Sequence, residues 1–353
     1  MGTVTYKSKI ALRDEVISGY VSIKDNVITY VGRECPEGCA VTELDGIIAP
    51  GFIDIHCHSS FTNRASVDPE EVASFHLAHG TTTMLLSFYR NIEHERLLRC
   101  LENTKEAMKK CKNLYGAHLE GPYLNANLGS GKGTNDSPDM ARCEEYIKTG
   151  IVKQWTSAPE IDGVVELIAR IAECGIVPAI GHSEAGYTKV KAAYDAGARI
   201  ATHIFDATGA PVSAYRGTLE VDFNEACMLM DGMFCEVICD SGWIHVRREK
   251  LALLERTVGI DRIIAITDMS AAGVADDGTD VSLVNGELAG TKLTMDRVAR
   301  NLYNGGYSIP EIFKLTSLNA SRVLGLSDRG EIAVGKRADL ILVDERANLI
   351  KVL

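Results

Sequence analysis

Six histidines and carboxylates in the sequence have the types and positions expected of ligands to one metal ion or a pair of ions. His56 and His58 are two residues apart in the segment GFIDIHCH, so their side chains point to the same side if this segment is a strand. Imidazole nitrogens and carboxylate oxygens are common ligands of zinc and other first-row divalent ions. The other four members of the group also close strand-like segments, and they are Glu120, His182, His203 and Asp268.

Each of these residues also has an ordinary structural interpretation when it is considered alone. A His-x-His pair can be satisfied within a barrel core, and a Glu or Asp at the end of a strand often caps the following helix. His182, which Ser183 and Glu184 follow, fits a loop and the start of a helix equally well. Packing requirements do not explain why all six residues fall at the same end of successive strands, so the group as a whole predicts a metal site.

The segments that must position these residues repeat a short apolar strand followed by a longer amphipathic helix. This alternation predicts an α/β protein with a closed (β/α)8 TIM barrel, in which the carboxyl ends of all strands meet at one face. An open doubly wound sheet is the alternative, but no G-x-G-x-x-G motif follows the first strand. The eight predicted strands span residues 51–58, 81–88, 114–120, 151–158, 175–182, 198–205, 233–240 and 262–268.

The two ends of the chain have a different pattern from the centre. Short alternating strands fill the first part of the sequence, and the last part contains the strand-like segment ADLILVD after a Gly-Lys-Arg turn. We therefore predict a small β-sandwich domain built from both termini, residues 1–48 and 330–353. The barrel then occupies residues 49–329.

Composition excludes several classes of function. The net charge is −11, which argues against a surface for nucleic acid or anionic membranes. No apolar run approaches the ~20 residues that cross a bilayer, and the N-terminus has no apolar segment of signal-peptide length. The ten cysteines include no C-x-x-C pair, which favours reduced thiols and a cytoplasmic location.

Several motifs resemble those of a known family. GFIDIHCH resembles the first-strand signature of the amidohydrolase superfamily. Further motifs are similar to those of N-acetylglucosamine-6-phosphate deacetylases, and the similarity runs from about residue 48 to the C-terminus. They are HLEGPYLN (118–125), GHSEA (181–185), THIFDA (202–207), DSGWIHV (240–246) and ITDMSAAG (266–273).

The resemblance implies a role for each member of the ligand group. Glu120, His182 and His203 would hold the ion that activates a water molecule, while His56 and His58 would complete a second metal position. One or two divalent ions, most simply zinc, are therefore expected in each subunit. Such an ion lowers the pKa of a bound water toward ~7. Asp268 would ligate one ion, take the proton from the water and deliver it to the leaving amine.

The resemblance also implies a substrate site. His245 would bind the sugar or its phosphate, and Arg216 would bind the phosphate as arginine does well. In this family that arginine comes from a neighbouring subunit, so a homodimer is expected. The segment GELAGTKLTM resembles the substrate loop of the family. The remaining expected contacts come from this loop and from THIFDA, and they are Asp206, Ala207, Leu288, Ala289 and Gly290.

Three departures from the family pattern concern the substrate. Asn135 stands where the family has a histidine that polarises the acyl carbonyl, and Asn donates a hydrogen bond but carries no charge. Asp206 replaces an asparagine, and its carboxylate would repel a phosphate unless Arg216 or Lys292 compensates. DSGWIHV has two residues more than the family motif. His118, two residues before Glu120, is expected to hydrogen-bond to the carboxylate of Glu120 rather than to bind metal.

These motifs predict a metal-dependent amide hydrolase that deacetylates an N-acetylated amino sugar 6-phosphate. A different amidohydrolase activity, such as that of an N-acyl-amino-acid deacylase or a cyclic amidase, is the first alternative. A barrel that has lost catalysis and serves as a binding protein is the second. Retention of all six ligand-type residues argues against the second alternative.

Overall fold

The structure is a computed structural model that describes residues 2–129, 135–284 and 286–353. Its largest part is a parallel sheet in which eight strands follow one another in sequence order. Backbone hydrogen bonds from His58 N to Met269 O and from Asp268 N to His56 O join the last strand to the first, so the sheet closes into a barrel. The strands are β5 (Phe52–Cys57), β6 (Thr81–Tyr89), β7 (Leu114–Glu120), β8 (Val152–Ser157), β9 (Val177–Ile180), β10 (Ile200–Ala201), β11 (Phe234–Ile238) and β12 (Ile263–Ile266). Each lies within or close to one of the eight predicted segments, and the predicted TIM barrel is confirmed.

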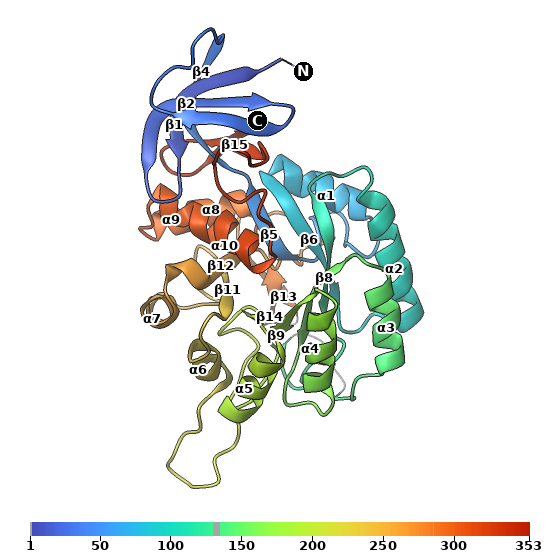
Figure 1. Cartoon of the computed structure of the whole chain (residues 1–353). Helices are drawn as coiled ribbons and strands as arrows, with labels where there is room; N and C mark the ends of the chain where they lie inside the picture. Colours follow the sequence, from blue (N-terminus) through green and yellow to red (C-terminus); the bar gives the residue numbers. More distant parts are fainter. Residues whose placement is uncertain (1, 130–134, 285) are drawn as a thin grey trace.

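Helices surround the barrel on its outer side (Figure 1). Their ends follow local signals in the sequence. Asp68 accepts a hydrogen bond from Glu71 N at the start of α1, and Asp222 forms a capping box with Glu225 at the start of α6. The main helices are α1 (Pro69–Ala78), α2 (His94–Ala107), α3 (Met140–Lys148), α4 (Val164–Glu173), α5 (Tyr187–Ala196), α6 (Phe223–Met228), α7 (Arg248–Val258) and α8 (Met295–Asn304). The chain then forms α9 (Ile309–Phe313), a π-helical turn (Lys314–Leu318) and α10 (Asn319–Val323).

Both chain termini contribute to a second, six-stranded sheet, as the strand patterns predict. Its strand order is β16-β15-β4-β1-β2-β3, so β15 pairs with the edge of β4 and β16 pairs with β15. The strands are β1 (Val4–Ala11), β2 (Val16–Lys24), β3 (Val27–Gly32), β4 (Val41–Pro50), β15 (Leu340–Val343) and β16 (Leu349–Val352). This sheet has its own core, which includes Ile10, Val21, Ile28 and Ile48. Of the predicted domain limits, 48 falls near the end of β4 and 330 lies in the segment that precedes β15, and both remain a prediction.

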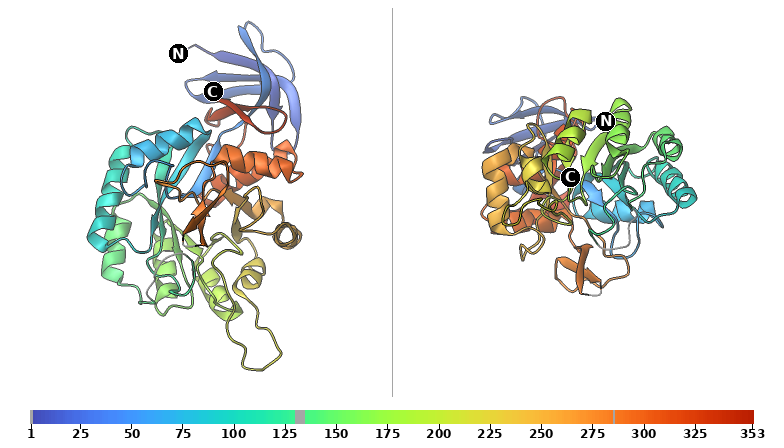
Figure 2. Two further views of the ribbon diagram at one scale, coloured as in Figure 1. Left: turned by 180° about the vertical axis from the view of Figure 1, so that it is seen from behind. Right: turned by 90° about the horizontal axis from the view of Figure 1, so that it is seen from below.

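Two segments extend from the carboxyl-terminal face of the barrel. The hairpin of β13 (Val281–Val284) and β14 (Glu287–Thr291) follows the last barrel strand, and Figure 2 shows it standing away from the body of the molecule. The loop between β10 and α6 extends further, as a long arm (Figures 1 and 2). Within the described ranges, no helix has the length and apolarity needed to cross a membrane.

Candidate metal centre and active site

The six ligand-type residues meet at the carboxyl ends of the barrel strands, and we refer to them together as the ligand cluster. His56 lies on β5 and Glu120 ends β7, while the others follow the ends of their strands by one or two residues. All six side chains are buried, with relative exposures of 9% or less. The ligand cluster consists of His56, His58, Glu120, His182, His203 and Asp268.

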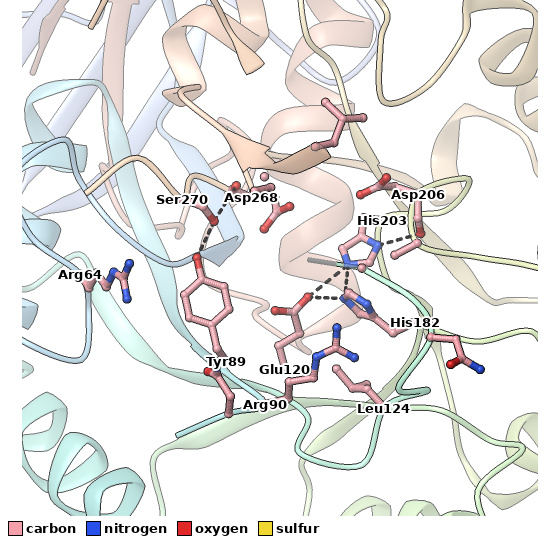
Figure 3. Close-up of a pocket in the computed structure, with 17 residues that line it drawn as sticks. Arg64, Tyr89, Arg90, Glu120, Leu124, His182, His203, Asp206, Asp268 and Ser270 are labelled. Atoms are coloured by element: carbon pink, nitrogen blue, oxygen red, sulfur yellow. Dashed lines mark hydrogen bonds and ion pairs between the residues drawn. The ribbon is translucent and has the colours of Figure 1, made fainter. Parts of the chain in front are cut away.

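Glu120 is the centre of the ligand cluster. Its Oε1 lies 2.8 Å from His182 Nε2 and 3.2 Å from His203 Nε2, and these two nitrogens are 3.1 Å apart (Figure 3). Its Oε2 lies 3.3 Å from His58 Nε2 on the other side. One carboxylate therefore contacts histidines from both predicted metal positions.

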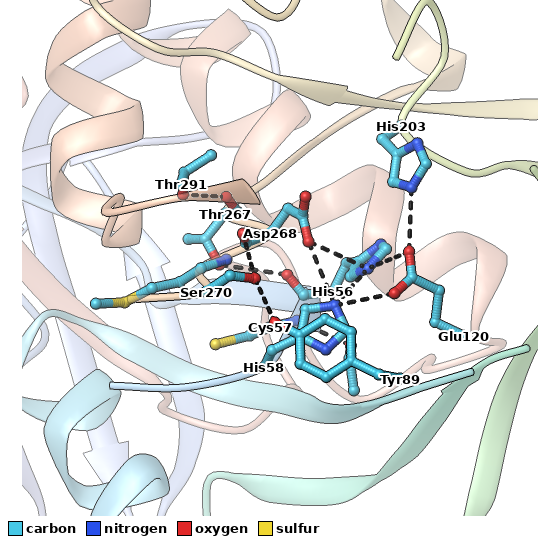
Figure 4. Close-up of polar contacts among 12 residues, drawn as sticks. His56, Cys57, His58, Tyr89, Glu120, His203, Thr267, Asp268, Ser270 and Thr291 are labelled. Carbon is cyan, nitrogen blue, oxygen red and sulfur yellow. Dashed lines mark hydrogen bonds and ion pairs between the residues drawn. The ribbon is translucent and has the colours of Figure 1, made fainter. Parts of the chain in front are cut away.

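The second half of the ligand cluster forms around the His-x-His pair. The Nε2 atoms of His56 and His58 are 3.1 Å apart, and Asp268 Oδ1 lies 3.5 Å and 3.3 Å from them respectively (Figure 4). Alternation along β5 places both imidazoles on the same side of the strand, as their spacing predicts. Asp268 therefore belongs to the same buried group as both histidines.

The donor set fits one or two divalent cations. Ligands at ~2.0–2.2 Å from a tetrahedral ion lie ~3.3 Å from one another, which is close to the observed separations. His182 Nδ1 faces the carbonyl of Leu128 at 3.4 Å, and His203 Nδ1 faces that of Asp206 at 3.2 Å. Each Nδ1 can donate to its carbonyl, which leaves the two Nε2 atoms, 3.1 Å apart, directed at Glu120 and at each other. Two ring nitrogens and a carboxylate that converge in this way can bind a cation.

Without a cation, the cluster balances its charge by holding protons on some of the histidines. Burial lowers the pKa of His56, but Asp268, Glu120 and Glu236 outweigh it and raise that pKa well above 6.5. Burial also lowers the pKa of His203, but Glu120 and Asp206 have the larger effect and raise this pKa to about 9. Burial raises the pKa of Asp268, yet His56 and His58 more than offset this, so its pKa stays below 3.8 and the carboxylate is ionised. Binding of a cation to this cluster must release protons.

Three ligands have backbone conformations that non-glycine residues rarely adopt. The φ angles are 46° at His182, 27° at His203 and 46° at Asp268. Such conformations cost about 1–3 kcal/mol each and persist where the surroundings enforce them, often at functional sites. In each case the chain turns out of a strand at this residue, and the turn directs the side chain over the mouth of the barrel.

A cavity of about 630 Å³ opens above the ligand cluster. Among the residues predicted to bind substrate, Asp206, Ala207 and the hairpin residues 288–290 line it, so the structure brings these together. Figure 3 shows Arg64 and Asp206 on opposite sides of the cluster, with Glu120 and Asp268 between them. The cavity is therefore lined on both sides of the metal position.

Sequence reasoning missed one side of this cavity. The Tyr89 ring stacks on the His58 ring with centroids 3.9 Å apart, and its hydroxyl donates to Ser270 Oγ at 2.6 Å (Figure 4). Arg90 donates hydrogen bonds to the carbonyls of Asn125 and Leu128, which shape the loop after β7. The available signal was position, because Tyr89 and Arg90 directly follow the second predicted strand, for which no functional residue was assigned.

The other predicted substrate residues lie outside the cavity lining. His245 is buried, and its Nδ1 bonds to Asp240 Oδ2 at 3.2 Å while its Nε2 has no hydrogen-bond partner among the described residues. Arg216 is exposed on the long arm between β10 and α6. Asn135 is also exposed, and its Oδ1 accepts a hydrogen bond from Ala126 N at 2.9 Å. The structure of a single chain does not bring Arg216 or Asn135 to the ligand cluster.

The expected bond of His118 is wrong, and one of the two residues considered as partners of Asp206 is engaged elsewhere. His118 does not bond to Glu120, because Ser87 Oγ lies 2.9 Å from its Nδ1 and Thr156 Oγ1 lies 2.8 Å from its Nε2. Both ring nitrogens are already engaged deeper in the barrel. Lys292 does not compensate Asp206, because its Nζ binds the carboxylate of Asp277 at 2.8 Å and 2.9 Å.

A third group of potential ligands lies behind the ligand cluster. Asp54, Cys57 and His76 are close enough to share an ion, but each has other partners. Asp54 accepts hydrogen bonds from Thr267 Oγ1 and His56 N, and the ring of His76 reaches the carbonyl of Ser59 at 2.9 Å. Burial raises the pKa of the Cys57 thiol well above 9.0. The group is therefore explained by packing of the barrel wall.

Comparison with known proteins agrees with this geometry. The model of the amidohydrolase family matches residues 47–352. The chain belongs to the amidohydrolase family. This assignment explains why imidazoles and carboxylates gather at the carboxyl ends of the barrel strands, and the family resemblance seen in the motifs is confirmed.

Relatives within this family share the whole architecture. An N-acetylglucosamine-6-phosphate deacetylase of Bacillus subtilis is 30% identical over 97% of this chain and 93% of its own length. An N-acetylgalactosamine-6-phosphate deacetylase of Escherichia coli is 26% identical over 91% and 89%. The solved N-acetyl-D-glucosamine-6-phosphate deacetylase of Mycobacterium smegmatis superimposes with a TM-score of 0.88 at 28% identity, covering 99% of this chain and 98% of that one. The enzyme of Thermotoga maritima gives a TM-score of 0.85, also at 28% identity, over 100% and 98%.

Proposed function

We propose that this amidohydrolase removes the acetyl group from an N-acetylated amino sugar 6-phosphate of the N-acetylglucosamine-6-phosphate type. The products are the amino sugar phosphate and acetate. The observation that carries the proposal is the buried contact of Glu120 with both histidine pairs, with Asp268 beside it. Relatives that cover the full chain and are named for this activity give the substrate class.

The ligand cluster would hold one or two divalent ions, and zinc suits its nitrogen and oxygen donors best. Such an ion polarises the amide carbonyl and makes water a stronger nucleophile at neutral pH. The protein's own contribution to proton transfer comes from Asp268. Its carboxylate is ionised, buried and directed into the cavity, so it can accept a proton from the attacking water and pass it to the amide nitrogen that leaves.

The amino sugar would occupy the side of the cavity that is lined by Asp206, Ala207 and the hairpin residues 288–290. The acyl group would then point to the opposite side of the cavity, toward Tyr89 and Arg64 (Figure 3). His245 is buried, and its Nε2, which has no hydrogen-bond partner among the described residues, would suit a phosphate or hydroxyl oxygen. Asp206 places a carboxylate on the same side of the cavity. This carboxylate would oppose the binding of a phosphate.

A second copy of the chain would complete the site. Arg216 is exposed at the end of an arm that also carries exposed apolar side chains, namely Val212, Tyr215 and Leu219. Apolar residues on a projecting loop are typical of a surface that another chain covers. We propose a homodimer in which the arm of one subunit brings Arg216 to the phosphate of the substrate bound by the other. All ten cysteines are free thiols, which is compatible with action in the cytoplasm.

Acetate release from a substrate panel tests the proposal. The panel contains N-acetylglucosamine and N-acetylgalactosamine, each with and without a 6-phosphate, together with an N-acetyl amino acid and a cyclic amide. The enzyme is first stripped of metal and then reconstituted with zinc. We expect zinc-dependent acetate release that is fastest with a hexosamine 6-phosphate. Faster turnover of the amino acid or the cyclic amide would identify another amidohydrolase activity, and inability to bind any divalent ion would revive the inactive barrel.

A further inference from the structure

The four histidines of the ligand cluster differ in what contacts the ring nitrogen that faces away from the metal position. In His182 and His203 this nitrogen, Nδ1, faces a backbone carbonyl. In His58 it has no partner among the described residues. In His56 it lies 3.2 Å from Oε2 of Glu236. Among these four histidines, and as far as the described residues show, only His56 has its outer nitrogen against a carboxylate.

Glu236 is an unusual residue to find at this place. It lies on β11 inside the barrel and is completely buried. Its other partners are neutral, since Oε1 accepts from Gln154 Nε2 at 2.7 Å and Oε2 accepts from His203 N at 3.3 Å. Burial of a carboxylate is costly unless a positive or strongly polarised group compensates it. The His56 ring is the ionisable group that contacts it, so the carboxylate is explained by what it does for His56.

The structure assigns Glu236 as a positioning residue for the second metal position. We propose that its contact with Nδ1 holds the His56 ring with the Nε2 lone pair toward His58 and Glu120, and so determines whether an ion is retained there. The proposal rests on the metal-dependent function proposed above. It concerns the protein's affinity for the ion and does not depend on the identity of the substrate.

Two physical effects support this role. A carboxylate that accepts the Nδ1–H proton fixes the tautomer of an imidazole and makes its other nitrogen a stronger ligand. The partner histidine has no such support, because the His58 ring is held by stacking on Tyr89 and its own Nδ1 has no partner among the residues that the structure describes. The pair at this metal position therefore depends on His56 more than on His58. His182 and His203 have carbonyl partners and do not use the Glu236 side chain to orient their rings.

Glu236→Gln separates orientation from packing because the side chain keeps its size. Gln154 donates its amide to Oε1 of Glu236, so the oxygen of the new amide would remain there and its NH2 group would take the place of Oε2. That NH2 group donates to Nδ1 of His56 and shifts the ring proton to Nε2. The nitrogen that should bind the ion is then blocked. Glu236→Asp keeps the charge but shortens the side chain, and it should have a smaller effect.

Asp54→Asn is a matched control. Asp54 is also a completely buried carboxylate in the barrel, but it contacts the backbone nitrogen of His56 at 3.2 Å and Thr267 Oγ1 at 2.6 Å rather than the ring. The full-length proteins are loaded with zinc, dialysed against a graded series of chelator concentrations and analysed for metal per subunit. Thermal unfolding and far-ultraviolet circular dichroism establish that each variant is folded. The double variant Glu236→Gln/His56→Gln is measured beside His56→Gln.

We expect the wild type to retain two ions and Glu236→Gln to hold the weaker one about 10- to 100-fold less tightly, with the other unchanged. The affinity of Glu236→Asp for the weaker ion should fall between those of the wild type and Glu236→Gln, and that of Asp54→Asn should match the wild type. Glu236→Gln should cause no further loss of metal when His56 is already replaced. Equal metal content in wild type and Glu236→Gln, including one ion in both, overturns the proposal. Equal loss in Asp54→Asn does so as well. If the wild type binds no divalent ion, it is the proposed function that fails.

Discussion

The ligand cluster and the substrate-binding loops of this protein are built in different ways. Every member of the cluster is buried at the end of a barrel strand, and each touches at least one other member within 3.5 Å. The loop residues Asn135 and Arg216 are exposed and contact none of them. The hairpin residues 288–290 line the cavity but belong to a two-stranded element outside the barrel sheet.

This difference separates chemistry from selectivity. Side chains fixed by strands of a closed barrel hold reacting groups within narrow limits, whereas loops can change without disturbing the barrel. The ligand cluster would therefore set the chemistry, and we expect the loops to determine which substrate enters. Substitutions in the cluster should affect turnover of every substrate, and substitutions in the loops should affect only some substrates.

The largest effect is expected from Asp268→Asn. The amide keeps the shape and one oxygen but cannot accept a proton, so kcat should fall by about 10²- to 10⁴-fold. Metal content should stay at the wild-type level because the imidazole ligands and Glu120 remain. Steady-state acetate release together with metal analysis checks both parts. A kcat within a few-fold of wild type would remove Asp268 from proton transfer.

Arg216→Ala should produce a smaller and selective effect. Loss of a charged hydrogen bond to phosphate costs roughly 1.5–3 kcal/mol, so kcat/KM for a 6-phosphate substrate should fall about 10- to 100-fold. The value for the unphosphorylated sugar should hardly change. Glu220→Gln, on the same exposed arm but without a role in the proposed interface, is the control for general disturbance of the loop. A parallel loss for both substrates would show that Arg216 does not bind phosphate.

His76→Gln should affect the pH dependence of stability rather than turnover. Burial lowers the pKa of His76 from 6.5 to about 4. As the pH falls from about 6.5 to about 4, His76 binds a proton in the unfolded chain but not in the folded chain, so the free energy of unfolding decreases. This group contributes up to about 1.4 kcal/mol per pH unit. Chemical denaturation between pH 7 and pH 4 should give a shallower decrease in the variant, and identical slopes would contradict the assignment.

The smallest effect is expected from Asn135→Ala. Its side chain is one contact removed from the cavity, because it bonds to Ala126 N beside the lining residue Asn127. Loss of this exposed hydrogen bond should change kcat by less than about threefold. A decrease of tenfold or more would mean that Asn135 leaves Ala126 and polarises the acyl carbonyl during the reaction, as the family pattern suggests.

Prediction from sequence succeeded where periodicity carried the information. Eight apolar segments at regular intervals located the barrel strands, and histidines or carboxylates at their ends located the ligand cluster. Glu236 could not be recognised in the same way, because a buried acid within an apolar strand has meaning only when its partner, His56, is known from another strand. Tyr89 was missed because a tyrosine at a strand end is usually part of the core. The bonds of His118 depend on Ser87 and Thr156, on two neighbouring strands, and no local pattern contains this information.

The pairing of β15 with β4 has a consequence for synthesis of the protein. The edge of β4 that carries Ile47 and Ile48 is hydrogen-bonded to residues 340–343, close to the other end of the chain. The chain from β4 through residue 343 must leave the ribosome before this edge is covered, and until then the edge presents unpaired backbone groups next to apolar side chains. Open edges of this kind invite pairing with other chains. Nascent or truncated chains that end before residue 340 are therefore the forms in which aggregation should begin.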